Sequence, residues 1–310
     1  MIQPSRTLAQ RLQSIPTRTI YLVLMLCAAI PLFFKVPLPN VPIDPSIDFF
    51  GNLMSLKEGD RVLISADWTN STRGESGGQT EALMRILMRK HIKFAVFAVG
   101  DPQAPQVERD IIARVAQEEE RNVGYRYTPF KDFTVIGYFP NGEGQATAVD
   151  NDVLKAFAGR KDLPPGGVPT DVRRSPVFAG IKSLSDFKYF INVTGSSTNT
   201  IYLERITKTP IMFMVTGVMV PENQNYYDSG QIKGMIGGVK GALDLETLME
   251  TGIEPGASSN FPEGLPGFKG MQNAGKGTAY YPTLHVCLFL LILAVVVGNV
   301  GMALARKEAR

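Results

Sequence analysis

The pattern of hydrophobic and polar positions changes abruptly near the carboxyl end of the chain. Residues 284–305 read LHVCLFLLILAVVVGNVGMALA and include no Lys, Arg, Asp or Glu. An apolar run of about 20 residues is long enough to span a bilayer as a helix. A buried helix of a globular domain rarely keeps every face apolar over this length. The pattern therefore predicts a transmembrane helix over residues 283–305.

A second uncharged run, residues 19–34, lies close to the amino terminus. It is slightly short for a span, but Lys35 can extend its charged end to one interface and Tyr21 suits the other. A signal peptide is the alternative interpretation, because a basic segment precedes the apolar run. The residues that follow, KVPLPNVP, do not form a small-residue cleavage site. This favours a retained transmembrane helix over residues 19–35.

The charges that flank the two apolar runs predict the orientation. Residues 1–18 carry three basic residues and no acid, and the tail at residues 306–310 carries three basic residues and one acid. The opposite flanks carry Lys35, Lys269 and Lys276. Because positively charged flanks remain in the cytoplasm, both termini are expected there and the central region is expected outside it. The expected location is an inner or plasma membrane.

Between the apolar runs, strand-like and helix-like segments alternate. The strand pattern occurs at residues 61–66, 93–99, 133–139, 187–193 and 211–215. The helix pattern occurs at residues 78–90, 106–120, 150–157 and 199–206, and within residues 226–249. Strands that are apolar throughout indicate a mostly parallel sheet that is covered on both faces. The predicted fold class is therefore α/β, a Rossmann-like three-layer domain flanked by two transmembrane helices.

Two segments rich in Pro and Gly set the expected limits of the domain. Residues 36–58 contain several prolines and are expected to form a linker that begins as an extended spacer. Residues 251–282 are rich in Gly, Pro, Ser and Asn, with little periodicity. A loop of this length is usually functional, disordered or wrapped on a partner. The globular domain is therefore expected over residues 59–250.

Composition excludes several functions. The formal net charge is only +3, and no basic cluster with interleaved aromatic residues occurs, so nucleic acid is not an expected partner. Both cysteines, Cys27 and Cys287, lie in the apolar runs, which leaves the predicted domain without a thiol nucleophile or disulfide. The histidines are His91 and His285, and neither is expected at the carboxyl edge of the sheet. This disfavours a Ser-His-Asp triad and a His-based zinc site there.

The carboxyl edge of the sheet is nevertheless where ligands of such folds bind. Asp67 and Glu75 follow the first predicted strand, and Asp101 follows the second. These carboxylates suit a hard cation such as Mg²⁺ or Ca²⁺, but they are equally typical of turns and helix caps. Thr194 and Thr216 follow the fourth and fifth strands.

Trp68 is the one tryptophan of the chain and directly follows the first predicted strand. It could stack on a sugar or base, but core packing or a contact at an interface is the favoured interpretation. Neither the G-x-G-x-x-G dinucleotide fingerprint nor a GxxxxGK[ST] phosphate loop occurs at the required position. No cofactor is expected.

Small residues recur every four positions in a stretch near residue 240. They are Gly230, Gly234, Gly238 and Ala242, joined by Gly241. Each glycine costs about 1 kcal/mol relative to Ala inside a helix, so a helix here needs close packing against another surface. That surface is either the domain's own sheet or another chain, and Tyr226 and Tyr227 could anchor either contact.

These patterns lead to one main hypothesis and two alternatives. The main hypothesis is a two-span membrane protein whose outward α/β domain is a structural or assembly subunit, binding copies of itself or other membrane proteins within the lipid bilayer. The first alternative is a ligand-binding or sensory domain at the carboxyl edge of the sheet. The second is a carboxylate- or metal-dependent hydrolase at the same edge.

Overall fold

The computed structural model describes residues 7–34, 38–68 and 70–308. The chain divides into two compact units. The α/β domain is Asn40–Gly277, and the helical unit comprises the described residues on either side of it. Parts of the expected basic segment 1–18, linker 36–58 and tail 306–310, together with Lys35, lie outside the described residues.

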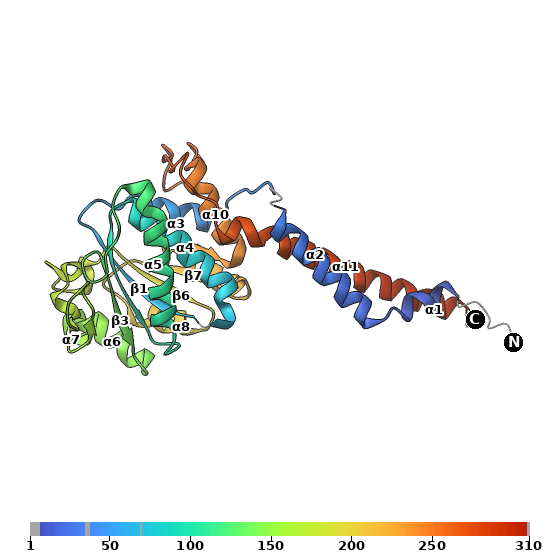
Figure 1. Ribbon diagram of the computed structural model, residues 1–310, viewed down its shortest axis with the longest axis horizontal. Coiled ribbons are helices and arrows are strands. Elements are labelled where there is room, and N and C mark those ends of the chain that lie inside the picture. Colours follow the sequence, from blue (N-terminus) through green and yellow to red (C-terminus); the bar gives the residue numbers. More distant parts are fainter. Residues whose placement is uncertain (1–6, 35–37, 69, 309–310) are drawn as a thin grey trace. The chain divides into compact units, whose positions relative to one another are not determined.

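A six-stranded sheet forms the centre of the domain, in the order β3-β2-β1-β6-β7-β8 (Figure 1). Every neighbouring pair is parallel, which confirms the predicted α/β class. The strands are β1 Arg61–Asp67, β2 Lys93–Ala98, β3 Phe133–Tyr138, β6 Tyr189–Thr194, β7 Ile211–Val215 and β8 Met235–Gly237. A separate antiparallel hairpin is formed by β4 Lys161–Asp162 and β5 Thr170–Asp171.

Helices cover both faces of the sheet and enclose two hydrophobic cores. The first core is covered by α3 Asp44–Met54, α4 Arg73–Arg89, α5 Ala104–Val123 and α10 Gly238–Thr251. The second is covered by α6 Gly142–Asn151, α7 Val153–Ala156, α8 Thr198–Arg205 and α9 Val220–Asp228. In β1, Val62 and Ile64 belong to the first core and Leu63 to the second. Burial on both faces explains why the strands read as continuous apolar runs.

The amino-terminal linker prediction is wrong over α3. Pro45 stands in the first turn of this helix, where its fixed φ and missing N–H are tolerated. Phe49, Phe50 and Leu53 are fully buried in the first core. The prolines of this segment therefore begin a helix of the domain instead of extending a spacer through it.

The expectation that the repeated glycines lie on one helix is also wrong. A turn at Gly230 and strand β8 separate α9 from α10. A Cβ atom at Gly234 would lie 2.6 Å from the backbone of Phe49, and one at Gly241 would lie 2.5 Å from the Ile236 side chain. Gly238 begins α10 with a positive φ of 57°. The close packing at Gly234 and Gly241 therefore occurs within the domain.

The remaining members of this group have internal contacts too. Ala242 is buried in α10. Tyr226 and Tyr227 lie on α9 and pack against the second core, and the Tyr227 hydroxyl donates to Asp48 Oδ2 at 2.7 Å.

The expected carboxyl-terminal linker, residues 251–282, is largely part of the domain. Ile253 is buried, and Phe261, Leu265 and Phe268 pack against the first core. The final helix, α11 Lys276–Glu308, begins seven residues before the predicted span. These apolar side chains attach the first part of the segment to the core, although it has no regular period.

The helical unit contains α1 Leu8–Gln13, α2 Thr17–Phe33 and all but the first two residues of α11. By length and composition, α11 can cross a membrane. The apolar helix α2 has 17 residues and is shorter than the length required of a candidate span. The Thr7 hydroxyl donates to Glu308, and the Thr283 hydroxyl lies 3.4 Å from the carbonyl oxygen of Ala28. The second contact joins α11 to α2, and the two helices run side by side in opposite directions (Figure 1).

Candidate functional site

The carboxyl edge of the sheet contains a topological switch point between β1 and β6. The chain adds β2 and β3 on one side of β1, and then returns to add β6, β7 and β8 on the other side. Ligands of open α/β sheets bind in the crevice outside such a point. Asp67 and Thr194, the last residues of the two strands, pair in register there. The Thr194 hydroxyl donates to the carbonyl oxygen of Asp67 at 3.2 Å.

Asp67 is buried and its carboxylate accepts four hydrogen bonds. Oδ1 accepts from the backbone N–H groups of Val99 at 2.6 Å and Gly100 at 3.1 Å. Oδ2 accepts from the Ser65 hydroxyl at 2.7 Å and from the Asn192 amide at 2.9 Å. The side chain thus joins β1 to β6 and to the loop after β2. Its oxygens serve as a structural bridge of the sheet edge.

The hydrogen bonds of Asp67 continue into α8. The Tyr202 hydroxyl lies 2.6 Å from the Ser65 hydroxyl. Because the Ser65 proton is donated to Asp67, Tyr202 must be the donor to Ser65. Burial raises the pKa of Asp67, while its hydrogen bonds oppose that rise. Burial, followed by the Asp67 charge, raises the pKa of Tyr202 well above its ordinary value.

Of the two interpretations left open for Asp67, Glu75 and Asp101, their contacts are those of structural residues. Glu75, in the first turn of α4, accepts a hydrogen bond from the Gly217 N–H at 2.7 Å. Asp101 accepts one from the Gln103 N–H at 2.6 Å, as turn residues do. Within the described parts of the chain, no group of three or more His, Cys, Asp and Glu side chains is placed to hold a metal ion.

Trp68 lies in the core, where its side chain is 1% exposed. Its indole Nε1 donates a hydrogen bond to the carboxylate of Glu108, which is fully buried on α5. Burial raises the pKa of Glu108 to about 7, and the indole hydrogen bond opposes the rise. Glu108 is not among the candidate residues predicted from the sequence. Its spacing of three and four residues before Ile111 and Ile112 was the available signal that it shares their buried face.

Several buried polar atoms around the amino-terminal half of α4 have no partner. Among the described residues, none is found for Ser76 Oγ, Gln79 Oε1 or Thr216 Oγ1. The Gln79 amide nitrogen is used, because it donates to the carbonyl oxygens of Val215 at 2.8 Å and Gly238 at 3.0 Å. Buried polar groups are normally paired with protein or with ordered water. This side of the crevice therefore retains hydrogen-bonding capacity.

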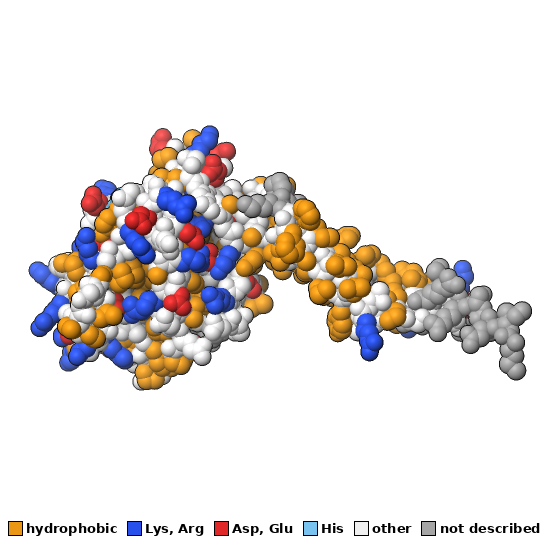
Figure 2. All heavy atoms as spheres, in the orientation of Figure 1, with side chains coloured by type: hydrophobic (Ala, Val, Ile, Leu, Met, Phe, Trp, Pro, Cys, Tyr) orange, Lys and Arg blue, Asp and Glu red, His pale blue; other side chains and the backbone are white. Residues whose placement is uncertain are grey.

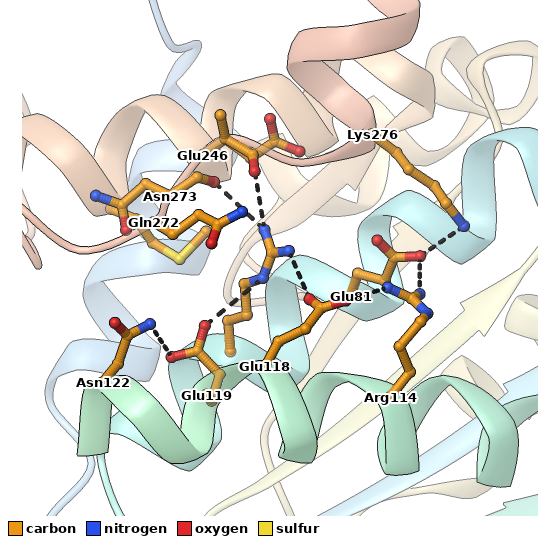
Figure 3. Close-up of polar contacts among 12 residues, drawn as sticks. Glu81, Arg114, Glu118, Glu119, Asn122, Glu246, Gln272, Asn273 and Lys276 are labelled. Carbon is orange, nitrogen blue, oxygen red and sulfur yellow. Dashed lines mark hydrogen bonds and ion pairs between the residues drawn. The ribbon is translucent and has the colours of Figure 1, made fainter. Parts of the chain in front are cut away.

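A denser group of buried charges joins α4, α5 and α10 (Figure 3). The Arg89 side chain is fully buried and pairs with Glu119 through Nε at 2.7 Å and Nη2 at 2.8 Å. Arg85 pairs with Glu118 at 3.1 Å. The two parallel hydrogen bonds between Arg89 and Glu119 fix both the distance and the relative plane of the guanidinium and carboxylate groups. These charges are the principal functional candidates that the sequence analysis missed.

The two arginines also hold the segment that leads into α11. Arg89 donates to the carbonyl oxygen of Gln272 at 3.0 Å and to the side-chain oxygen of Asn273. Arg85 lies 3.4 Å from the carbonyl oxygen of Ala274. Asn273 in turn donates to the carboxylate of Glu250 at the end of α10. A chain segment with few apolar residues is thus fixed by buried charged groups.

The first two residues of α11 complete this arrangement. The Lys276 ammonium pairs with Glu81 of α4, which also pairs with Arg114 of α5 (Figure 3). The N–H of Gly277 donates to Glu246 of α10 at 2.7 Å. We call residues 272–277, with the charged side chains that bind them, the α11 clamp.

Comparison with known proteins assigns no function to this site, because the chain matches no protein-family model, no curated protein and no solved structure.

Proposed function

We propose that this chain is a non-enzymatic assembly subunit of a membrane complex, anchored by two transmembrane helices and carrying its α/β domain outside the cytoplasm. The single observation that carries the proposal is the α11 clamp. Charged side chains of α4 and α10 bind residues 272–277, where the domain continues into a membrane-length helix, and charged side chains of α5 pair with those of α4. Buried ion pairs are costly to assemble and strongly destabilising to break, so they suit a permanent structural element of the domain.

The contacts at the carboxyl edge support a non-catalytic role. The carboxylates of Asp67, Glu75 and Asp101 accept hydrogen bonds from the domain's own donors. Asp67 is moreover a poor candidate for the catalytic group of a hydrolase, because it is buried and both of its carboxylate oxygens accept hydrogen bonds from internal donors.

Two features support α2 as the second span. It lies alongside α11, so a membrane crossed by α11 would surround α2 as well. Large apolar side chains are exposed along both helices, including Tyr21, Met25, Phe289 and Ile292. Exposed apolar surface of this extent is typical of contact with lipid or another protein. The basic flanks at residues 1–18 and 306–310 support cytoplasmic termini.

A membrane-impermeant maleimide tests this topology. Gln10→Cys, Lys57→Cys and Lys307→Cys would each be made in a Cys27→Ala/Cys287→Ala background, since all three positions are exposed. Labelling of Lys57→Cys in intact cells, with the other two labelled only after permeabilisation, is expected. Labels on Gln10→Cys and Lys307→Cys from opposite sides would instead mean that only one helix spans.

The assembly function is tested by the mass of the detergent-extracted full chain, measured by size exclusion with light scattering. A defined particle of several copies, or one with a stoichiometric second protein, supports the proposal. A protein mass of one 33.9 kDa chain would contradict it.

A ligand-binding domain is the second candidate, because Ser76, Gln79 and Thr216 keep unpaired buried atoms beside the switch point. The full chain would be melted in the presence of glucose, ATP or inorganic phosphate. A rise in Tm that Thr216→Val abolishes would favour this function, while unchanged melting with all three probes would count against these ligand classes.

A further inference from the structure

A groove of about 430 Å³ lies beside the β4–β5 hairpin, lined by residues 126–129 and 163–166. We call it the basic groove. Three prolines line it, Pro129, Pro164 and Pro165, and their fixed φ angles limit its rearrangement. Leu163 and Val168 of the hairpin are 53% and 75% exposed. The groove is therefore a stiff surface with an apolar rim.

The charge around this groove is positive because the hairpin's acids are used internally. Asp162 is buried against Arg109 at 2.8 Å, and Asp171 pairs with Arg173. In the part of the chain that the structure describes, no ion pair is found for the neighbouring exposed side chains Arg126, Lys161 and Arg174. Figure 2 shows basic side chains gathered at this end of the domain, on the left of the view.

A surface of opposite charge projects elsewhere on the same domain. It is the loop of residues 253–265, here called the acidic loop, which carries exposed Glu254 and Glu263 beside Pro255 and Pro262. Neither glutamate has an ion partner among the described residues. The loop stands at the top of the view in Figures 1 and 2, away from the basic groove.

The acidic loop is held in one shape before any partner arrives. Ile253 and Leu265 exchange two backbone hydrogen bonds, at 2.8 and 2.9 Å, which close its base. Asp48 of α3 accepts hydrogen bonds from Ser258 at 2.7 Å and from the Asn260 amide at 2.6 Å. A loop fixed in this way loses little conformational entropy on binding.

We propose that the acidic loop of one copy of this chain docks in the basic groove of a second copy. The inference rests on the proposed assembly function and names its partner, another copy in a head-to-tail contact. The charges are complementary, both surfaces are preorganised, and the two surfaces lie apart on the domain, so one copy cannot satisfy both by itself. A contact between two different surfaces builds a ring or an open row of copies.

Charge reversal with rescue tests the pairing on the full chain in detergent. Arg126→Glu/Lys161→Glu makes both the groove and the loop acidic, whereas Glu254→Lys/Glu263→Lys makes both basic. Each variant alone should self-associate at least about tenfold more weakly than the natural chain, because attraction becomes repulsion. A mixture of the two should recover the large particle, since every loop then meets a groove of opposite charge.

The matched control is Lys57→Glu/Glu58→Lys, at two exposed positions outside both surfaces, and it should leave the particle unchanged. Disulfide trapping supplies a second measurement in the Cys27→Ala/Cys287→Ala background. Val168→Cys should cross-link to Ala257→Cys when the two chains are mixed, and neither should cross-link alone.

The outcomes separate this inference from the assembly function. A defined particle that survives both charge reversals, or a Val168→Cys chain that cross-links to itself, overturns the head-to-tail contact and leaves the assembly function standing. A natural chain that is a monomer overturns both.

Discussion

At the scale of single residues, the pairing of Trp68 with Glu108 places a titratable group beside the chain's one tryptophan. The folded domain holds this carboxyl group out of water, and its pKa rises from an ordinary 4.5 to about 7. The protonated form is therefore the one that folding favours. Ionisation of Glu108 should be visible both in stability and in Trp68 fluorescence.

The sign of the pH effect follows from that rise. A folded-state pKa above the unfolded value adds stability that is fully present below about pH 4.5 and is lost as the pH rises through about 7. At 1.36 kcal/mol per pKa unit, the contribution of Glu108 is about 3 kcal/mol. Urea unfolding across this range should show the loss, and Glu108→Gln should remove it. A natural chain and a Glu108→Gln chain with parallel pH profiles would refute the assignment.

At the scale of elements, α4 has two functions along its length. Its amino-terminal half meets the switch point through Glu75 and Gln79. Its carboxyl-terminal half supplies Arg85 and Arg89 to the α11 clamp. The helix therefore connects the edge where ligands of this fold bind to the segment that enters α11.

Replacing one buried partner of the clamp should be costly. Arg89→Met removes the nearer of the two arginines that pair with the buried Glu119 carboxylate, leaving Arg85 Nε at 3.7 Å and the Asn122 amide at 3.0 Å. The free energy of unfolding is expected to fall by about 3 kcal/mol, the lower end of the cost of breaking a buried pair. Arg173→Met removes a solvent-exposed pair with Asp171 and should have a much smaller effect, because exposed ion pairs contribute little to stability. Equilibrium urea unfolding distinguishes the two. Equal effects would mean that the clamp adds nothing beyond a surface pair.

The glycines offer a second comparison between elements. Gly234→Ala forces a methyl group against the Phe49 backbone and should destabilise the domain by about 1–3 kcal/mol. Gly74→Ala, in the first turn of α4 with open space around it, should be neutral or stabilising by up to about 1 kcal/mol. Thermal melts of both variants would measure this. A tolerated Gly234→Ala would show that α3 and the turn before β8 can separate.

At the scale of the whole molecule, the domain extends well beyond the alternating strand and helix pattern. Helix α3 and the segment after α10 add Phe49, Phe50, Leu53 and Ile253 to the first core. The compact unit is Asn40–Gly277 instead of the expected 59–250. Domain limits drawn at Pro- and Gly-rich segments were therefore too narrow.

Expression of two fragments tests these limits. Residues 40–277 should unfold in one cooperative transition, because that fragment keeps both cores and the charges of the clamp. Residues 59–250 should lack such a transition, because this fragment does not contain four apolar side chains that are buried in the first core. They are Phe49, Phe50, Leu53 and Ile253. Circular dichroism melts provide the measurement. A cooperative melt of the shorter fragment would mean that α3 and the later segment are accessory.

The sequence by itself determined the α/β class and the five long strands. A strand buried on both faces is apolar at most of its positions, and this signal is local. It also predicted a membrane-length apolar helix near the carboxyl end, because the length and composition of that run are read directly from the residues. It placed Asp67 and Thr194 at strand ends, and parallel strands bring such ends to one edge.

Only the tertiary structure decided what those residues contact. The three-residue strand β8 is too short to show a period. Gly234, just before it, packs against Phe49, which lies about 185 positions earlier in the chain. Asp67 became an internal bridge because donors from β1, β6 and the loop after β2 converge on it. Arg85 and Glu119 are charged residues of a kind that usually lies on the solvent-exposed face of a helix. They are buried here because α4, α5 and residues 272–277 pack together. Partners so distant in the chain leave no local pattern, since burial of a charge depends on which surfaces meet.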